Sequence, residues 1–216
     1  MFRNLRLLIF VLFAACSMDS KKVDQKSVAE EMKNREIKKV SDSEILSSAH
    51  ERGAEIAAMA QAALSKKLFE VVSNQGTGKA IEYCNIAAYP ILDSLSETHH
   101  AEIRRVSLKL RNPKDAPDEL ERQLLEAYEF NVEKGLELTE NIQEIDDQYI
   151  LFTKPISIGS PMCLKCHGEV RKDISEEDHS IIRSLYPSDS ATGYKLGDLR
   201  GIWSVKLSKK EIVKSL

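Results

Sequence analysis

The 216-residue sequence predicts a single α+β domain in which helices flank a small antiparallel sheet. Apolar residues recur at helical spacing over a long stretch that begins near residue 42, and three later stretches alternate as strands do. No strand alternates with helices in the βαβ order of a parallel sheet. The composition, 42% hydrophobic and 30% charged, is that of a globular protein with a real core. The net charge of −3 gives no reason to expect nucleic-acid binding.

Residues 1–15 are expected to be an export signal rather than part of the fold. Two arginines precede an apolar run that is too short to span a bilayer. The following Leu-Phe-Ala-Ala-Cys resembles a bacterial lipobox, which predicts lipidation of Cys16; cleavage without lipidation is the alternative. Either way the mature chain is exported. The lipid would anchor it on the periplasmic side of a bacterial membrane, and Ser17 slightly favours the outer membrane.

Residues 17–40 are polar, mixed in charge and without a sustained apolar face, so we expect a tether. The domain is predicted to cover residues 41–216. It begins with a capping box, Ser41 and Glu44, at the start of a long amphipathic helix that reaches about Asn74.

Later helices are placed by their start and stop signals. Pro90 is expected to separate two short helices, Asp115 to cap a long one that persists despite Gly135, and Ser175 to cap the next. The predicted helices cover residues 79–88, 91–97, 117–145, 175–185 and 209–216.

Strands are predicted where the apolar period changes to two, or where β-branched and aromatic residues gather. In the first, Val106 and Leu108 alternate with Arg105, Ser107 and Lys109. The predicted strands cover residues 102–110, 149–158 and 201–207.

The segment Cys-Leu-Lys-Cys-His, residues 163–167, is the attachment sequence of a c-type haem. One turn of chain must bring two thiols beneath the two vinyl groups of one porphyrin, and the adjacent imidazole must then meet the iron. The sequence therefore predicts one covalent haem c on Cys163 and Cys166, with His167 as the proximal iron ligand. Haem c is attached outside the bacterial cytoplasmic membrane, so this motif and the export signal support each other.

Three other roles compete for these cysteines. A zinc site usually needs four ligands, but Cys16 and Cys84 are distant in sequence. A thioredoxin-type dithiol needs a βαβ context, which is missing here. A disulfide across two residues would be strained and would leave His167 unexplained. The strands and the position of the motif also exclude the small helical cytochromes.

Several segments follow one another in a recognisable order: residues 82–85, 104–113, 163–168, 186–189, 193–194 and 197–201. This order resembles a bacterial family of single-haem c-type domains with a PAS-like fold, which stand alone or form extracytoplasmic parts of signalling proteins. Asp115 and Leu120 depart from the family pattern. The resemblance implies a PAS-like fold with a proximal His167 and, as sixth iron ligand, a cysteine that corresponds here to Cys84.

The residues themselves leave Cys84 open between a ligand and a buried structural thiol. Rival sixth ligands are His99, His100 and Met162, whereas His50 and His179 lie in no motif. Candidate contacts of the haem propionates are Arg104, Arg105 and Arg111, because guanidinium groups pair with carboxylates.

The leading expectation is a protein for redox or small-ligand sensing that acts through an unknown redox or signalling partner. The alternatives are an electron-transfer cytochrome c and a haem enzyme such as a peroxidase. An enzyme is not expected, because six-coordinate iron leaves no open site for substrate.

Overall fold

The computed structural model describes residues 24–34 and 40–216. The chain divides into two units, Met1–Lys39 and Val40–Leu216. In the first, helix α1 (Gln25–Asn34) lies within the stretch expected to be a tether. The predicted export signal and Cys16 lie outside the described residues. Within the described part, no helix is both long enough and apolar enough to cross a membrane.

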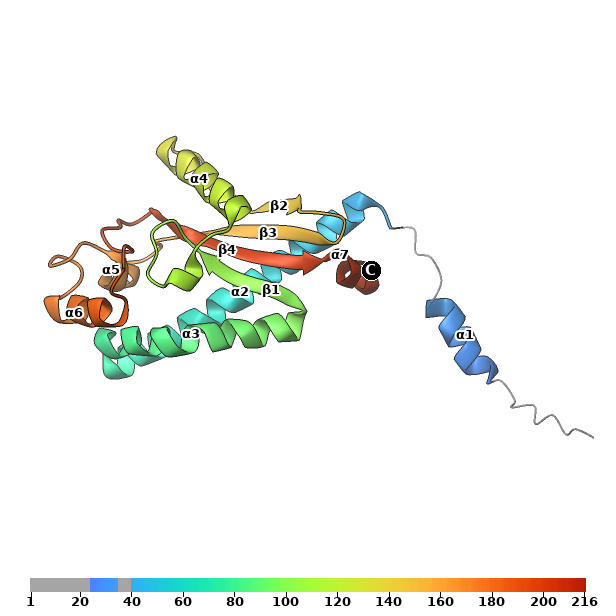
Figure 1. Ribbon diagram of the computed structural model, residues 1–216, viewed down its shortest axis with the longest axis horizontal. Helices are drawn as coiled ribbons and strands as arrows, with labels where there is room; N and C mark the ends of the chain where they lie inside the picture. The colour runs from blue at the N-terminus through green and yellow to red at the C-terminus, as the bar shows by residue number, and fades with distance from the viewer. Residues whose placement is uncertain (1–23, 35–39) are drawn as a thin grey trace, which may run out of the picture. The chain divides into compact units, whose positions relative to one another are not determined.

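The second unit has the predicted α+β architecture (Figure 1). Its four strands form one sheet in the order β1-β4-β3-β2, and all neighbouring strands are antiparallel. In chain order the elements are α2 (Asp42–Gln75), α3 (Thr77–His99), β1 (Ala101–Val106), the 3-10 helix η1 (Pro113–Asp115), α4 (Glu119–Glu133), β2 (Asn141–Glu144), β3 (Tyr149–Ser157), α5 (Pro161–His167), α6 (Glu176–Leu185), β4 (Leu199–Ser208) and α7 (Lys209–Ser215).

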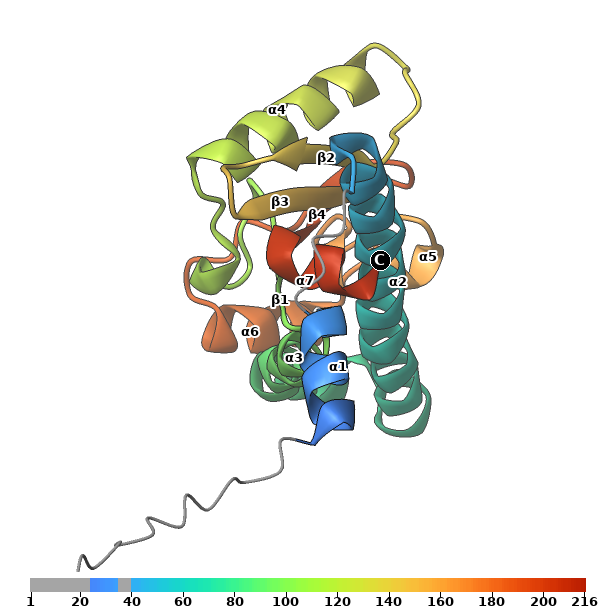
Figure 2. The same cartoon turned by 90° about the vertical axis from the view of Figure 1, so that its right-hand side faces the viewer.

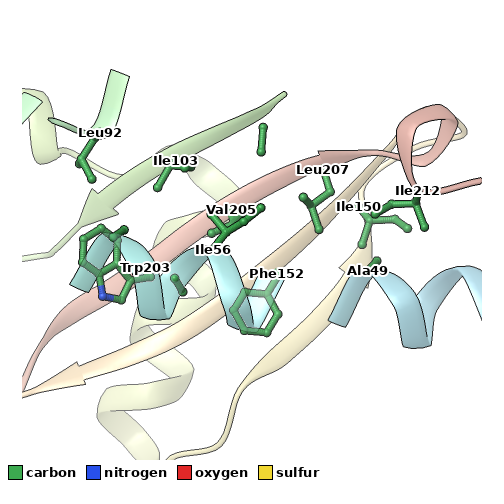
Figure 3. Packing of buried hydrophobic residues seen from close by; sticks show 13 residues of the cluster. Ala49, Ile56, Leu92, Ile103, Ile150, Phe152, Trp203, Val205, Leu207 and Ile212 are labelled. Carbon is green, nitrogen blue, oxygen red and sulfur yellow. The ribbon is translucent and has the colours of Figure 1, made fainter. Parts of the chain in front are cut away.

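The main core lies between the sheet and the long helix α2 (Figure 3). Alternate residues of β4, namely Trp203, Val205 and Leu207, point to this side, as the two-residue period of a strand requires. Phe152 of β3 and Ile56 of α2 meet them and are almost fully buried. Burial of each such side chain stabilises the fold by roughly 1.5–3 kcal/mol.

The other side of the sheet carries a second cluster beneath α4, and Figure 2 shows α2 and α4 on different sides of the strands. Ile202 of β4 and Val106 of β1 pack there against Leu125 and Tyr128 of α4. The sheet is therefore covered on both sides, and its strands hold a fixed register from which the loops at their ends extend.

Most predicted elements are confirmed, beginning with the capping box. The Ser41 hydroxyl accepts from the Glu44 amide, and the Glu44 carboxylate accepts from the Ser41 amide at 2.8 Å. The predicted long helix is α2, and the capping role of Ser175 on α6 is also confirmed.

The prediction that Pro90 separates two helices was wrong, because α3 runs through it from Thr77 to His99. A proline removes the hydrogen bond to the carbonyl four residues earlier. That residue is Ile86, which is 76% exposed. Water can therefore satisfy the freed carbonyl, while packing on α2 holds the helix together.

The helix predicted over residues 117–145 is much shorter. Asp118 rather than Asp115 caps α4, which ends at Glu133. Gly135 follows at φ +67°, a left-handed conformation that ends helices. The chain then returns as β2, a strand that the sequence did not reveal.

The strand predicted over residues 102–110 ends at Val106. The Ser107 amide leaves the sheet and donates to the Asp115 carbonyl at 3.1 Å. This turn closes residues 107–115 into a loop that reaches the site described next.

Candidate functional site

A cavity of about 800 Å³ opens at the end of the sheet, bounded by α2, α3, α5 and the ends of β1, β3 and β4. This volume lies within the range of cofactor and small-molecule sites. Small and apolar side chains form much of its wall: Ala57, Ala62, Leu68, Ile81, Ala88, Ile156 and Ile158. The same wall contains Cys84, Cys163, Cys166 and His167. The fold thus brings the motif of α5 together with the lone cysteine of α3.

Helix α5 positions the motif. Pro161 lies in its first turn, where its missing amide hydrogen costs nothing. Cys163 and Cys166 are three residues apart, so both thiols lie on the side of the helix that borders the cavity. Gly168 then ends the helix by donating to the Leu164 carbonyl at 2.8 Å. A Cβ atom at Gly168 would lie 2.5 Å from the Asp173 Cβ and 2.7 Å from the Leu164 carbonyl oxygen, so a larger residue does not fit there.

His167 is held in one tautomer. Its Nδ1 lies 2.9 Å from the backbone carbonyl oxygen of Ala191. A carbonyl can only accept, so Nδ1 carries the hydrogen and the Nε2 lone pair of the neutral ring is free to bind a metal. Burial, together with the nearby charges of Arg200 and Arg111, holds the pKa of His167 well below its usual value. The ring is therefore neutral at physiological pH.

Burial favours the protonated form of two cavity cysteines, Cys166 and Cys84. Burial raises the pKa of Cys166 to about 11, although Arg111 opposes this shift. Burial also raises the pKa of Cys84, and Arg105 and Arg111 oppose it. The two arginines therefore lie close enough to stabilise a Cys84 thiolate if the thiol loses its proton on binding a cation.

Arg111 lies on the cavity wall but is already paired. Its guanidinium donates to both carboxylate oxygens of Asp189, at 3.1 and 3.2 Å, and to the Cys166 carbonyl at 2.7 Å. The side chains of Arg111 and Asp189 are only 12% and 5% exposed. Arg111 therefore connects the loop after β1, the loop after α6 and the helix of the motif.

Arg104 and Arg105 differ in position. Arg104 lies outside the cavity, on a separate groove between α3 and β1, and donates to Glu121 at 3.1 Å and to the Ala116 carbonyl at 2.7 Å. Arg105 borders both hollows and lies 3.9 Å from the Asp115 carboxylate.

Sequence reasoning missed Arg200, which precedes the buried part of β4 and borders the cavity. Its Nη1 donates to the Ser107 hydroxyl at 2.6 Å and to the Lys109 carbonyl at 3.2 Å. Its buried Nε has no hydrogen-bond partner among the residues that the structure describes. In the sequence, Arg200 stands between Asp198-Leu199 and Gly201. Nothing in this pattern distinguishes it from an ordinary arginine at the start of a strand.

The rival ligands are mostly elsewhere. Met162 borders the cavity, but His50, His99, His100 and His179 do not. His50 lies 3.2 Å from the Glu140 carboxylate. Within residues 24–34 and 40–216, no group of three or more Cys, His, Asp or Glu side chains is arranged to hold a metal ion, as the zinc alternative would require.

Comparison with known proteins agrees with this fold. No curated protein matches the chain. The crystal structure of the cyanobacterial heme protein Tll0287 shares 22% sequence identity with it, and the alignment covers 86% of this chain and 97% of that one, with a TM-score of 0.50. At this identity the likeness concerns the fold. The sequence profile of the Tll0287-like family matches residues 20–208, and the chain therefore belongs to the Tll0287-like family.

Proposed function

We propose that the chain binds one haem c in the cavity, covalently through Cys163 and Cys166, with His167 as proximal iron ligand. The observation that carries this proposal is the convergence of the complete attachment motif with Cys84 on one cavity of about 800 Å³. The description of the structural relative Tll0287 as a heme protein supports the same cofactor.

The residues present fit a haem. The cavity offers two thiols on one side of a helix, a neutral imidazole with a fixed Nδ1 hydrogen, and a wall of small apolar side chains. It also offers the guanidinium of Arg200, which forms no ion pair with a carboxylate in the described part of the chain and so suits a cofactor that carries carboxylates. When bound, the haem would supply an iron that takes up and releases one electron.

We propose Cys84 as the sixth iron ligand. α3 presents it to the cavity, and the motif comes from a different wall. Arg105 and Arg111 favour its anionic form electrostatically. A thiolate gives electron density to iron, and this lowers the reduction potential relative to ligation by His and Met. Such a ligand suits redox or small-ligand sensing better than substrate turnover, and the signal would leave through a partner protein.

The experiment expresses the full chain with a haem-maturation system and stains a denaturing gel for haem. We expect stain that stays with the denatured wild-type chain and is lost in Cys163→Ala/Cys166→Ala. A Cys84→Ala variant should keep the stain but lose the thiolate features of the ferric absorption spectrum. An unstained wild-type band would refute the haem proposal, and an unchanged Cys84→Ala spectrum would refute only the sixth ligand.

Redox titration of the same protein separates sensing from electron transfer. A very low potential with a change of ligand on reduction is expected for the sensor. A mid-range potential, unchanged ligands and fast exchange with another cytochrome would instead indicate an electron carrier.

We also propose that the chain is exported and lipid-anchored through Cys16, on the periplasmic side of a bacterial membrane. The lipobox-like sequence before Cys16 supports this proposal. Wild-type chain should sediment with membranes, and Cys16→Ala should not be lipidated. A Cys16→Ala chain that sediments with membranes as fully as wild type would refute the anchor.

A further inference from the structure

Arg200 is a partly buried cation, and among the described residues its guanidinium donates hydrogen bonds to neutral oxygens, those of Ser107 and Lys109. Across the described ranges 24–34 and 40–216, no carboxylate lies within ion-pair distance of it. Within the same residues its buried Nε has no hydrogen-bond partner, and the ring of Tyr194 lies 5.7 Å from its guanidinium carbon. Within the described residues, the charge of Arg200 therefore has no ion-pair partner, although Tyr194 and the charge of Asp115 favour it in part.

The two neighbouring arginines of the cavity wall, Arg111 and Arg105, differ from Arg200 because each lies near a carboxylate. Arg111 is neutralised by Asp189 through two hydrogen bonds, and Arg105 lies 3.9 Å from Asp115. Both arginines act on Arg200 as like charges and, after burial itself, they help to lower the pKa of its guanidinium. The cavity wall thus carries a positive charge in excess. Leaving a buried charge uncompensated is strongly unfavourable, unless a ligand supplies the opposite charge.

The position of Arg200 is fixed by hydrogen bonds that join the start of β4 to the loop after β1. The Ser107 hydroxyl accepts from Arg200 Nη1 at 2.6 Å and donates to the Arg200 carbonyl at 2.7 Å. Ser107 is itself buried at the end of β1. The Arg200 side chain is consequently held in place before any ligand binds. Little conformational entropy of this side chain would then be lost on binding.

We propose that Arg200 is the anchor for a carboxylate of the ligand of this cavity, with Arg105 beside it as a second, weaker contact. The inference rests on the haem proposal, under which the carboxylate is a haem propionate. Arg200 would then supply the positive charge opposite the propionate, and the propionate would supply the carboxylate partner that the described residues do not give Arg200. Arg104, which lies outside the cavity, and Arg111, which donates two hydrogen bonds to Asp189, are not part of this site.

The test compares Arg200→Gln and Arg200→Lys with a matched control, Arg104→Gln, in the haem-loaded full chain. We expect Arg200→Gln to lower the reduction potential, because an uncompensated propionate favours the ferric iron, and Arg200→Lys to retain most of the wild-type value. Arg104→Gln should leave the potential unchanged. Equal potentials of Arg200→Gln and wild type would overturn the proposal.

Thermal unfolding gives a second readout that a merely structural role would not reproduce. Arg200→Gln should lower the Tm of the haem-loaded chain by about 4 °C or more, yet leave unchanged or raise the Tm of the same chain made without the maturation system. A similar fall in both forms would show a structural role only. A wild-type chain without haem stain would instead be a failure of the proposed function, and the two failures are distinguishable.

Discussion

The imidazole of His167 donates its Nδ1 hydrogen to the backbone carbonyl of Ala191, 2.9 Å away, and so directs Nε2 to any ligand. The same loop is fixed from the other side, since the Ala191 amide donates to the Asp189 carboxylate at 3.0 Å. Asp189 in turn is held by Arg111. The orientation of the candidate iron ligand therefore depends on an ion pair two residues before the carbonyl.

Replacing Arg111 with alanine should strongly destabilise the protein. It would leave the Asp189 carboxylate buried and unpaired, which typically costs about 3–5 kcal/mol of unfolding free energy. Chemical denaturation of the haem-free chain measures this change. The control is Arg171→Ala, which breaks an ion pair with Glu176 whose side chains are 79% and 76% exposed. It should cost about 0–1 kcal/mol, and equal costs for the two variants would contradict the prediction.

Replacing Gly168 with alanine should also destabilise the fold, by about 1–3 kcal/mol, because the new Cβ meets Asp173 and the Leu164 backbone. Gly159→Ala is the matched control, since the nearest atom to its Cβ would be the Ser157 carbonyl oxygen at 3.9 Å. Both variants are compared with wild type by chemical denaturation. A Gly168→Ala variant as stable as Gly159→Ala would show that Asp173 moves away freely.

Cys166 should react slowly with iodoacetamide in the folded, haem-free chain. Only the thiolate reacts, and burial raises the pKa of this thiol to about 11. The labelling rate should therefore rise about tenfold per pH unit between pH 8 and pH 10, whereas a denatured chain levels off near pH 9. Peptide mass spectrometry after timed labelling measures the rate at Cys166. A rate that already levels off near pH 9 in the folded chain would contradict the prediction.

Tyr89 should make the protein sensitive to alkali. Its hydroxyl donates to the buried Asp115 carboxylate at 2.7 Å. Burial, followed by this hydrogen bond, raises the pKa of Tyr89 far above 10. The folded state then favours the protonated phenol, so the contribution is complete below pH 10 and is lost as the pH rises above it. Urea denaturation should show a steeper loss of stability above pH 10 in wild type than in Tyr89→Phe.

Tyr89→Phe should also cost about 1.5–3 kcal/mol at neutral pH, because a buried carboxylate loses a hydrogen bond. Tyr83→Phe on the same helix is the control, and it should leave the stability at neutral pH unchanged. Parallel pH profiles of wild type and Tyr89→Phe would refute a special role for this hydroxyl.

The elements that the sequence predicted well were those with strong local signals. The capping box of Ser41 and Glu44 and the two-residue period of β3 need no distant contact to be recognised. Pro90 and β2 were misjudged because their outcome depends on tertiary packing: the helix through Pro90 lies on α2, and β2 is a short strand stabilised by pairing with β3.

The residues of the candidate site also differ in how far the sequence could predict them. Cys163, Cys166 and His167 form a local pattern, so the sequence was enough to single them out. That Cys84 borders the same cavity follows only from the path of α3 across the fold. Arg200 was missed because, in the described part of the chain, it stands out only by having no carboxylate partner. The sequence around an arginine does not show whether a distant carboxylate pairs with it.

Cys84 and Cys163 are about 80 residues apart in the chain, yet they border one cavity. A haem held by both residues, as proposed, would cross-link the chain into a loop of that length. Such a cross-link restricts the unfolded chain as a disulfide does, and this would raise the free energy of unfolding by about 4–5 kcal/mol. Unlike a disulfide, this cross-link would open whenever the iron–sulfur bond is released. The cross-link between α3 and α5 would then depend on the oxidation state of one iron atom.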